Sequence, residues 1–310
     1  MRLVTKSLVI GFLSISHVIS FGQNSEKHKS VSVTDISINA GPVFGTNHAW
    51  NTQDFIKLAP NSRLANDDLT GYSASNYGMY SYGPMIGPST ASQVSLQLGL
   101  SFKKKDGSAM KGSPLLRLGL NYRSESLFNG YLGRTDRFAY DTLISNATGN
   151  AHYVDSVYSY SYDMRYFVQQ LHVDASLVYR TNKEKRASFY GGIGMMLGLG
   201  VNPTTEISYH SSKYTEIINN SNQYTYGSYV GGYGTSEHEM EKTRNNIAFS
   251  GSLYVPLGVD LKFSTKNEFW KRVHWTFELR PSVNFFHSPE IGMLTSFSSY
   301  HGIGMRFNLK

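Results

Sequence analysis

Apolar and polar residues alternate with a period of two in eight segments of this 310-residue chain. A period of two is typical of a β-strand that turns one face to an apolar environment. Alternation repeated through eight segments predicts strands more firmly than any one segment could, although it is weaker in the first and fourth. The segments lie at about residues 31–44, 94–102, 116–123, 163–180, 189–201, 247–263, 273–285 and 303–309.

The connections between these segments alternate in length. Short turns at one end and long loops at the other are typical of a transmembrane β-barrel. We therefore predict an all-β, antiparallel, up-and-down transmembrane barrel of eight strands with both termini at the periplasmic end. Extra hairpins in the long loops would raise the number to about 10–12 strands. The short connections are 103–113, 181–186, 264–272 and 286–295, and the long ones are 45–90, 125–162 and 202–245.

Residues 1–22 have the layout of a secretory signal peptide. Arg2 and Lys6 precede a mostly apolar stretch from Leu8 to Ile19, and small residues stand at Ser20 and Gly22, before the expected cleavage. The stretch is too short to cross a bilayer as a helix. We therefore predict a leader over 1–22 and one barrel domain over 23–310. An exported chain without a long apolar helix can span a membrane only as a closed barrel.

Several of these features resemble a known group of proteins. Phe21-Gly22-Gln23 spans the predicted end of the leader, eight alternating segments follow, and the chain closes with Gly302-Ile303-Gly304-Met305-Arg306-Phe307-Asn308-Leu309-Lys310. This pattern resembles the Bacteroidota outer-membrane β-barrel proteins, and it is similar in architecture to the small eight-stranded OmpA-type barrels. The resemblance implies a Gram-negative outer membrane as the location. Such chains often end on an aromatic residue, whereas here Phe307 stands three residues before the end.

Composition narrows the classes of function. The chain has no cysteine, which excludes disulfides, thiolate metal sites and a cysteine nucleophile. A net charge of +7 and a pI of about 9.3 would ordinarily suggest nucleic acid as a partner. The short turns, however, are net basic and the long loops net acidic, and only 16% of residues are charged. We therefore predict outer-membrane lipid as a partner, and no nucleic acid.

Charged residues recur on the polar side of the predicted strands. An eight-stranded barrel is filled by its own side chains, and an unpaired buried charge is costly. We therefore predict an ion-pair network that fills the lumen. Its members would be Arg117, Arg123, Asp174, Asp260, Lys262, Glu278, Arg280 and Arg306, with Arg180 on the same face.

Possible catalytic and ligand-binding motifs are weak. His172 and Asp174 share one strand face and could orient a general base, but a satisfied polar pair is the simpler interpretation. His210-Ser211-Ser212 lies in a loop, and Glu237-His238-Glu239 lacks a second histidine at helical spacing. The glycines from Gly192 to Gly198 lack the strand–turn–helix context of a dinucleotide site. We predict no catalytic residue, no cofactor and no metal site.

Two triplets in the second long loop indicate a modification. Asp141-Thr142-Leu143 and Asp155-Ser156-Val157 are similar to the Asp-(Ser/Thr)-aliphatic O-glycosylation site of Bacteroidota. The sequence thus predicts O-glycosylation of Thr142 and Ser156.

The long loops are rich in tyrosine. They hold 16 of the 22 tyrosines, and runs such as Tyr158–Tyr162 and Tyr224–Tyr229 could prolong strands outside the membrane. Tyrosine combines a large rigid surface with a polar tip, which suits contact surfaces. We therefore predict a non-enzymatic outer-membrane barrel whose loops bind other outer-membrane or surface proteins, as an accessory subunit of a secretion, assembly or uptake complex. The alternatives are a narrow channel for small solutes and, third, a barrel enzyme acting on lipid or peptide.

Overall fold

A computed structural model describes residues 31–45, 52–67, 78–80, 91–102, 114–149, 151–181, 185–218 and 235–309. The predicted leader lies outside these residues. No helix in the described ranges is long and apolar enough to span a membrane. The elements are β1 (Val31–Gly45), α2 (Thr52–Leu58), α3 (Arg63–Asp67), β2 (Gly78–Tyr80), β3 (Ala91–Phe102), β4 (Leu115–Ile144), β5 (Ala151–Arg180), β6 (Ala187–Ile218), β7 (Thr235–Arg244), β8 (Ala248–Tyr254), β9 (Leu257–Lys262), β10 (Val273–Ser288) and β11 (Gly292–Asn308).

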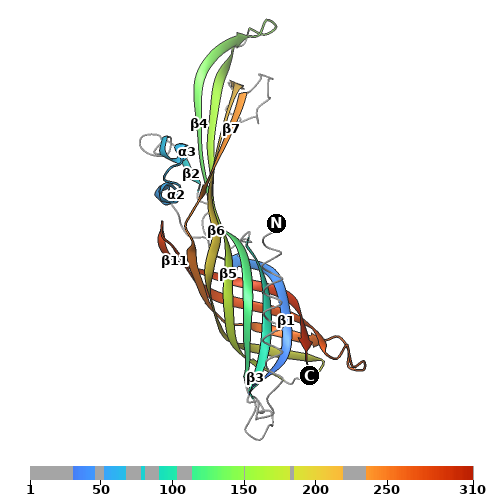
Figure 1. Cartoon of the computed structure of the whole chain (residues 1–310). Coiled ribbons are helices and arrows are strands. Elements are labelled where there is room, and N and C mark those ends of the chain that lie inside the picture. Colours follow the sequence, from blue (N-terminus) through green and yellow to red (C-terminus); the bar gives the residue numbers. More distant parts are fainter. Residues whose placement is uncertain are drawn as a thin grey trace.

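The strands form a closed antiparallel barrel with eight positions around the ring (Figure 1). The order is β1, β3, β4, β5, β6, then β8 with β9, then β10 and β11. Closure comes from β1 and β11, which pair from Asp35 with Asn308 to Gly45 with Ser298. The predicted all-β, eight-stranded barrel is confirmed, and the alternative of about 10–12 barrel strands is wrong for the described ring.

The sixth alternating segment is divided into β8 and β9 at Val255-Pro256. Proline has no N–H to donate to a neighbouring strand, so the ladder is interrupted there. The gap is small, because Val255 N–H donates to the Pro281 carbonyl at 3.0 Å and Gly192 N–H donates to the Pro256 carbonyl at 3.0 Å. The two strands therefore occupy one position in the ring.

Outward-facing side chains form an apolar belt around the barrel. At the end with the short turns, the Phe263 ring packs against Trp270 and Trp275 at centroid separations of 5.6 and 5.5 Å. Aromatic rings of this kind mark the edge of the apolar band in transmembrane barrels. A belt this large is an interface with lipid rather than with water. Its exposed members include Ile38, Val94, Leu118, Leu120, Leu171, Val173, Leu177, Phe189, Ile193, Leu197, Phe249, Leu253, Leu257, Phe277, Leu279 and Ile303.

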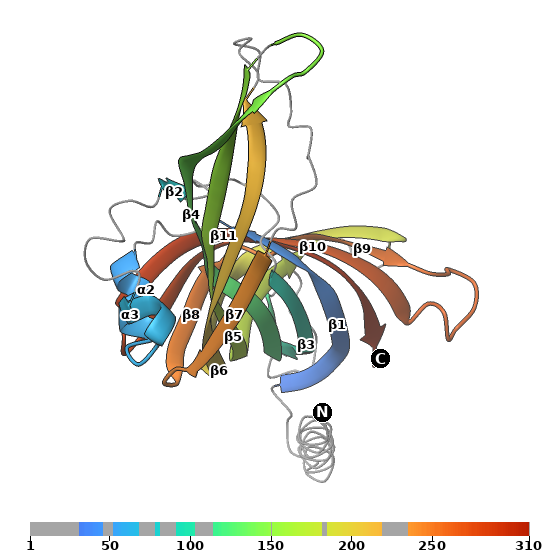
Figure 2. The same cartoon turned by 90° about the horizontal axis from the view of Figure 1, so that it is seen from above.

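Three strands continue far beyond the belt. β4 and β5 have 30 residues each and β6 has 32, whereas about 9–11 residues suffice to cross a bilayer. Together with β7 and the short β2, their outer parts form an extension of the same sheet, called the ribbon here (Figures 1 and 2). Large parts of 125–162 and 202–245, predicted as loops, are therefore strands. Tyr158–Tyr162 does prolong β5, whereas Tyr224–Tyr229 lies outside the described residues.

A row of irregularities separates the ribbon from the barrel. The register shifts around Leu127 in β4 and around Val168 in β5. At the same level Asn202 has a φ of 53°, and β6 exchanges its partner β8 for β7. Bulges bend a strand and increase its twist. This row, called the hinge here, turns three wall strands out of the ring.

The hinge also changes which residues share a face. In β4 the odd-numbered residues face the lumen up to Glu125, whereas just beyond the bulge the even-numbered Phe128, Gly130 and Leu132 are buried. In β6 the buried set changes likewise, from even numbers in the barrel to odd numbers from Thr205. The lumen side of the wall thereby continues as the ribbon face that α2 and α3 cover.

Glycines facing the lumen accommodate tyrosine rings from the opposite strand. Gly194 pairs with Tyr254 and Gly258 pairs with Tyr190. A Cβ added at either glycine would overlap the facing ring. The small residues of β6 and β9 therefore create the space in which large side chains fill the lumen.

This packing predicts that Gly194→Val destabilises the barrel. The added side chain would displace Tyr254, and overpacking of this kind costs about 1–3 kcal/mol. Urea unfolding in lipid vesicles measures the loss of stability, and the heat-dependent gel mobility of folded barrels reports the folded fraction. Gly191→Ala is the matched control, because its nearest neighbour is the flexible end of Leu257 at 3.3 Å. Equal stability of Gly194→Val and the unmodified protein would contradict this packing.

Candidate functional site

The middle of the lumen is organised around the Glu278 carboxylate. Arg117 Nη1 donates to Glu278 Oε2 at 2.8 Å, the Tyr190 hydroxyl donates to the same oxygen at 2.6 Å, and Arg280 donates to Oε1. The Arg117 guanidinium also lies 4.4 Å from the centre of the Tyr190 ring. β4, β6 and β10 supply these groups, so the network ties separate parts of the wall together.

Arg280 lies between two aromatic rings. Its guanidinium carbon is 5.3 Å from the centre of Tyr254 and 5.1 Å from that of Tyr300. Asp174 is 3.6 Å from Arg280 Nη1, and it accepts hydrogen bonds from the Tyr254 hydroxyl and from Gln97 Nε2. Charge pairing and ring packing together compensate for the loss of hydration of this cation.

A second group lies nearer the short-turn end. Asp260 accepts hydrogen bonds from Arg306 Nε at 2.6 Å and from His274 Nδ1. Arg180 is 3.7 Å from Asp260, and Arg306 is 3.7 Å from Asp35. Half-buried Lys262 is the cross-strand neighbour of His274.

The third group lies under the opposite mouth. Arg123 Nη2 donates to Glu125 at 2.6 Å, and Gln170 Nε2 donates to the other Glu125 oxygen at 3.2 Å. His172 Nε2 lies 2.9 Å from Ser250 Oγ. The carboxylate of Asp174 instead binds Tyr254 and Gln97, so the two residues considered as a catalytic pair have separate partners. Beside this group is a cavity of about 20 Å³, which has room for about one water molecule.

These contacts fill the lumen with side chains from most of the wall. The structure brings seven of the eight residues proposed for the network into ion pairs with other lumen residues. Sequence reasoning missed Glu125, because the hinge beyond it ends the alternation, and Asp35, because the first segment alternates poorly. It also left out the aromatic members Tyr190, Tyr254 and Tyr300.

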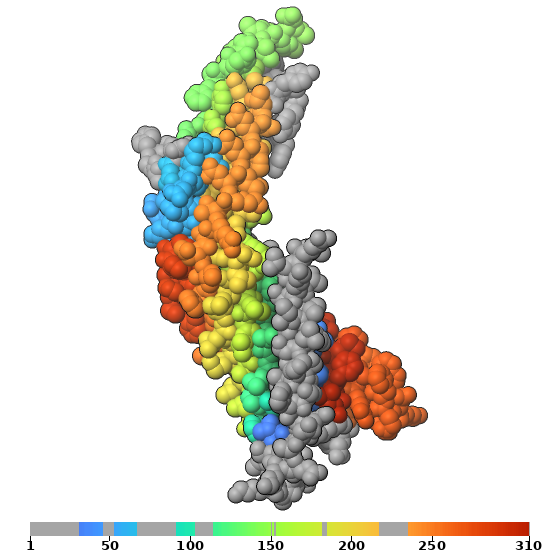
Figure 3. All heavy atoms as spheres, in the orientation of Figure 1, coloured from blue at the N-terminus to red at the C-terminus, as the bar shows by residue number. Residues whose placement is uncertain are grey.

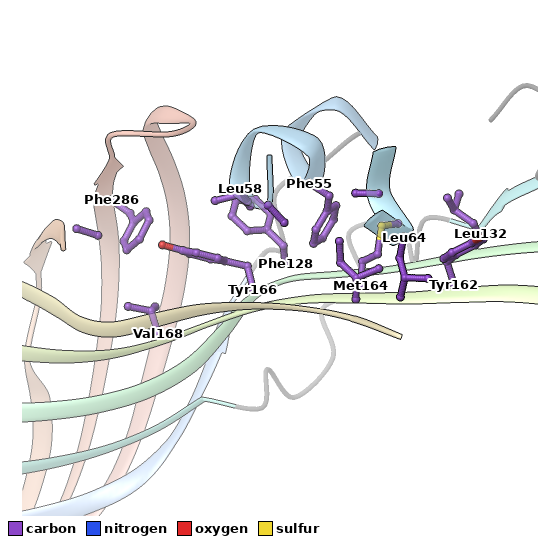
Figure 4. Close-up of a cluster of buried hydrophobic side chains, with 14 residues drawn as sticks. Phe55, Leu58, Leu64, Phe128, Leu132, Tyr162, Met164, Tyr166, Val168 and Phe286 are labelled. Atoms are coloured by element: carbon purple, nitrogen blue, oxygen red, sulfur yellow. The ribbon is translucent and has the colours of Figure 1, made fainter. Parts of the chain in front are cut away.

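An apolar cluster lies above the mouth of the lumen (Figure 4). Phe55, Leu58 and Leu64 from the two helices pack against Phe128 and Tyr166 of the ribbon and against further buried residues. The Phe128 ring is 5.7 Å from Tyr166 and 6.5 Å from Phe55, measured between centroids. Phe286 of β10 extends the cluster to the barrel rim. We call it the mouth cluster.

Polar contacts hold the helices in place. Ser62 caps α3 by accepting a hydrogen bond from Ala65 N–H at 3.0 Å. The Ser62 hydroxyl also donates to Glu241 of β7, and Arg63 pairs with Glu239. Figure 3 shows the helices between the ribbon and the β10–β11 rim. The mouth cluster therefore fixes the helices beside the rim at the end where the ribbon leaves the barrel.

The outer part of the ribbon carries uncovered aromatic and apolar residues. The Tyr158 ring is 6.5 Å from Tyr160 and 5.8 Å from Phe138, measured between centroids. Lys213 Nζ lies 5.0 Å from the Tyr158 centroid. Hydrogen bonding between them lowers the pKa of the Tyr158 phenol and raises the pKa of Lys213. Towards the tip, Phe138 is 59% exposed, Tyr140 69% and Ile144 67%.

The two predicted glycosylation positions lie on the same part of the ribbon but differ in access. Thr142 is exposed in β4 near the tip. Ser156 in β5 is only 5% exposed, so a folded ribbon would not present its hydroxyl to an enzyme.

No protein-family model and no curated protein matches the chain. Among solved structures, Neisserial surface protein A aligns over 91% of this chain and 100% of its own, with 11% identity and a TM-score of 0.34. Ail, the attachment invasion locus protein of Yersinia pestis, aligns over 89% and 100%, with 12% identity and a TM-score of 0.22. At TM-scores this low, the similarity to these two structures is no evidence for the fold beyond the strand pairing of this chain. That pairing and the apolar belt define an eight-stranded transmembrane β-barrel.

Removal of the Glu278 carboxylate should destabilise the barrel, because it leaves a buried charge unpaired. Glu278→Leu would leave Arg117 buried without its acceptor, which costs about 3–5 kcal/mol. The double variant Arg117→Leu/Glu278→Leu should recover part of this loss, because one buried cation is also removed. Urea unfolding in vesicles gives the free energies. A double variant that is no more stable than the single one would contradict the pairing.

Proposed function

We propose that this protein is an integral outer-membrane anchor that presents its ribbon outside the cell, with both termini in the periplasm, and that the ribbon binds another envelope or surface protein. The barrel would fix the ribbon in the membrane, and the bound partner would make the protein an accessory subunit of a secretion, assembly or uptake complex. The predicted leader fits export of such a protein.

The observation that carries this proposal is the uncovered aromatic and apolar surface of the outer ribbon. Phe138, Tyr140, Leu143, Ile144 and Tyr153 are all at least 46% exposed. Apolar patches of this kind on a soluble surface mark contact sites, and aromatic residues are enriched in the central parts of protein interfaces. Membrane anchoring alone requires none of these residues.

The filled lumen counts against the channel alternative. Buried ion pairs around Glu278, Asp260 and Glu125 occupy it at successive levels. The enzyme alternative has little support, since Asp174 does not orient His172 and the His172–Ser250 contact lies buried beneath the mouth cluster. Neither alternative explains why three wall strands extend so far beyond the bilayer.

Purification in mild detergent tests the proposal. The ribbon variant Phe138→Ser/Tyr140→Ser should lose at least about tenfold in recovery of a stoichiometric partner, which corresponds to about 1.4 kcal/mol. Thr135→Ala is a matched control, because Thr135 is exposed on the same strand and is not aromatic. Quantitative mass spectrometry of the co-purified proteins gives the ratio.

Two outcomes would contradict the proposal. One is a barrel that always emerges alone under conditions that preserve other envelope complexes. The other is a partner recovered equally with the ribbon variant and with the control. Heat-dependent gel mobility of each variant verifies that the barrel has folded.

We further propose O-glycosylation of Thr142 rather than Ser156, since only Thr142 is exposed. Intact-mass analysis of protein from its native membrane should show an added glycan. Thr142→Ala should remove that mass, and Ser156→Ala should leave it unchanged. A mass equal to that of the bare polypeptide would contradict the proposal.

A further inference from the structure

Two histidines that are far apart in the sequence face each other on the ribbon. His210 of β6 is directly opposite His238 of β7. Their ring centroids are 6.4 Å apart with an interplanar angle of 54°. Both side chains are exposed, and within the described residues neither imidazole makes a hydrogen bond. The pair therefore has free ring nitrogens beside each other.

The pair lies on the ribbon face away from the helices. Glu239, the neighbour of His238, points to the other face and pairs with Arg63 of α3. Serines surround the imidazoles: Ser161 is opposite His210 in β5, and Ser212 is opposite Ser236. Small neighbours leave the rings room to turn.

A thioether lies on the same face. Met240 is two residues from His238, and successive side chains of a strand alternate between faces. Met240 is 49% exposed and is opposite Ser208. The Met240 sulfur therefore belongs to the next side chain along this face, about 7 Å along the strand from His238.

This arrangement suits a transition-metal ion. Directly opposite residues of an antiparallel pair have Cβ atoms about 4.5–5.5 Å apart, so rotation of two exposed side chains can bring a nitrogen from each to one ion at about 2.0–2.1 Å. No group of three histidines and carboxylates that could hold a metal occurs in the described residues. The site would therefore be open, with two protein nitrogens and exchangeable positions. Such nitrogen sites bind Cu²⁺ most tightly among first-row divalent ions.

We propose that His210 and His238 bind Cu²⁺, and that the ion clamps the edge strand β7 to β6. Among the described residues β7 pairs only with β6, and the two histidines are 28 positions apart in the chain. A metal that joins two distant positions restricts the chain as a cross-link does. This site is separate from the aromatic surface proposed to bind a partner.

Copper titration of the untagged full-length protein in detergent tests the site. Calorimetry should show one Cu²⁺ bound per chain, with weaker binding of Zn²⁺. His210→Ala and His238→Ala should each weaken Cu²⁺ binding at least about tenfold. Electron paramagnetic resonance of the unmodified protein should show two coupled nitrogens, and each single variant should show fewer. His287→Ala, which removes another exposed histidine, should leave binding unchanged.

Hydrogen exchange provides a second measurement, independent of affinity. Cu²⁺ should slow the exchange of backbone amides in 235–244 in the unmodified protein and in His287→Ala, but not in His238→Gln. Copper binding that is equal in the two alanine variants and the unmodified protein would overturn the proposal. Unchanged exchange of β7 on copper binding would overturn the clamp. Because both histidines are exposed, the variants are expected to fold, and gel mobility checks this.

Discussion

The pairing of β1 with β11 is the constraint on which the rest of the structure depends. Inside a bilayer no water can satisfy an unpaired backbone N–H or C=O group, so a sheet must close on itself. Closure at eight strands makes the interior narrow enough to be filled by side chains. The filled interior in turn requires that each buried charge has a counter-charge. The networks around Glu278 and Asp260 are therefore consequences of closure, and so are the glycines that accommodate Tyr190 and Tyr254.

The hydrogen-bonding groups of the backbone are satisfied differently on the two sides of the hinge. Below it, the ring satisfies the strands and lipid covers their outer face. Above it, β4, β5 and β6 keep their mutual hydrogen bonds but lose the ring, so one face needs a new cover. Mouth-cluster residues such as Phe55 and Leu58 supply that cover, and the phase change in β4 and β6 delivers apolar side chains to meet them. One row of irregularities thus replaces a polar lumen wall with an apolar one.

Local alternation was sufficient to predict the barrel but not the ribbon. Each wall strand has lipid on one side and a polar lumen on the other, so its sequence alternates and the eight segments could be located. The ribbon strands carry serine, threonine and tyrosine on both faces, and the extra residues at Leu127 and Asn202-Pro203 interrupt the period. The same interruption placed Glu125 in a predicted loop. In the sequence His210 and His238 belong to separate motifs, and only the register of β6 and β7 makes them neighbours. Burial of Ser156 likewise depends on the packing of the ribbon strands, which the triplet Asp155-Ser156-Val157 does not predict.

The continuity of β4, β5 and β6 through the hinge fixes the height of the ribbon tip. From Phe128 to Ile144 the chain rises about 50–60 Å at the spacing of an extended strand, and no flexible linker intervenes among the described residues of β4. A partner at the tip would be held at a set distance from the bilayer, with little conformational freedom left to lose on binding. Because side chains repeat every two residues, that distance can change only in steps of about 7 Å without exchanging the two faces. The ribbon is therefore a rigid spacer whose length can change only in steps of two residues.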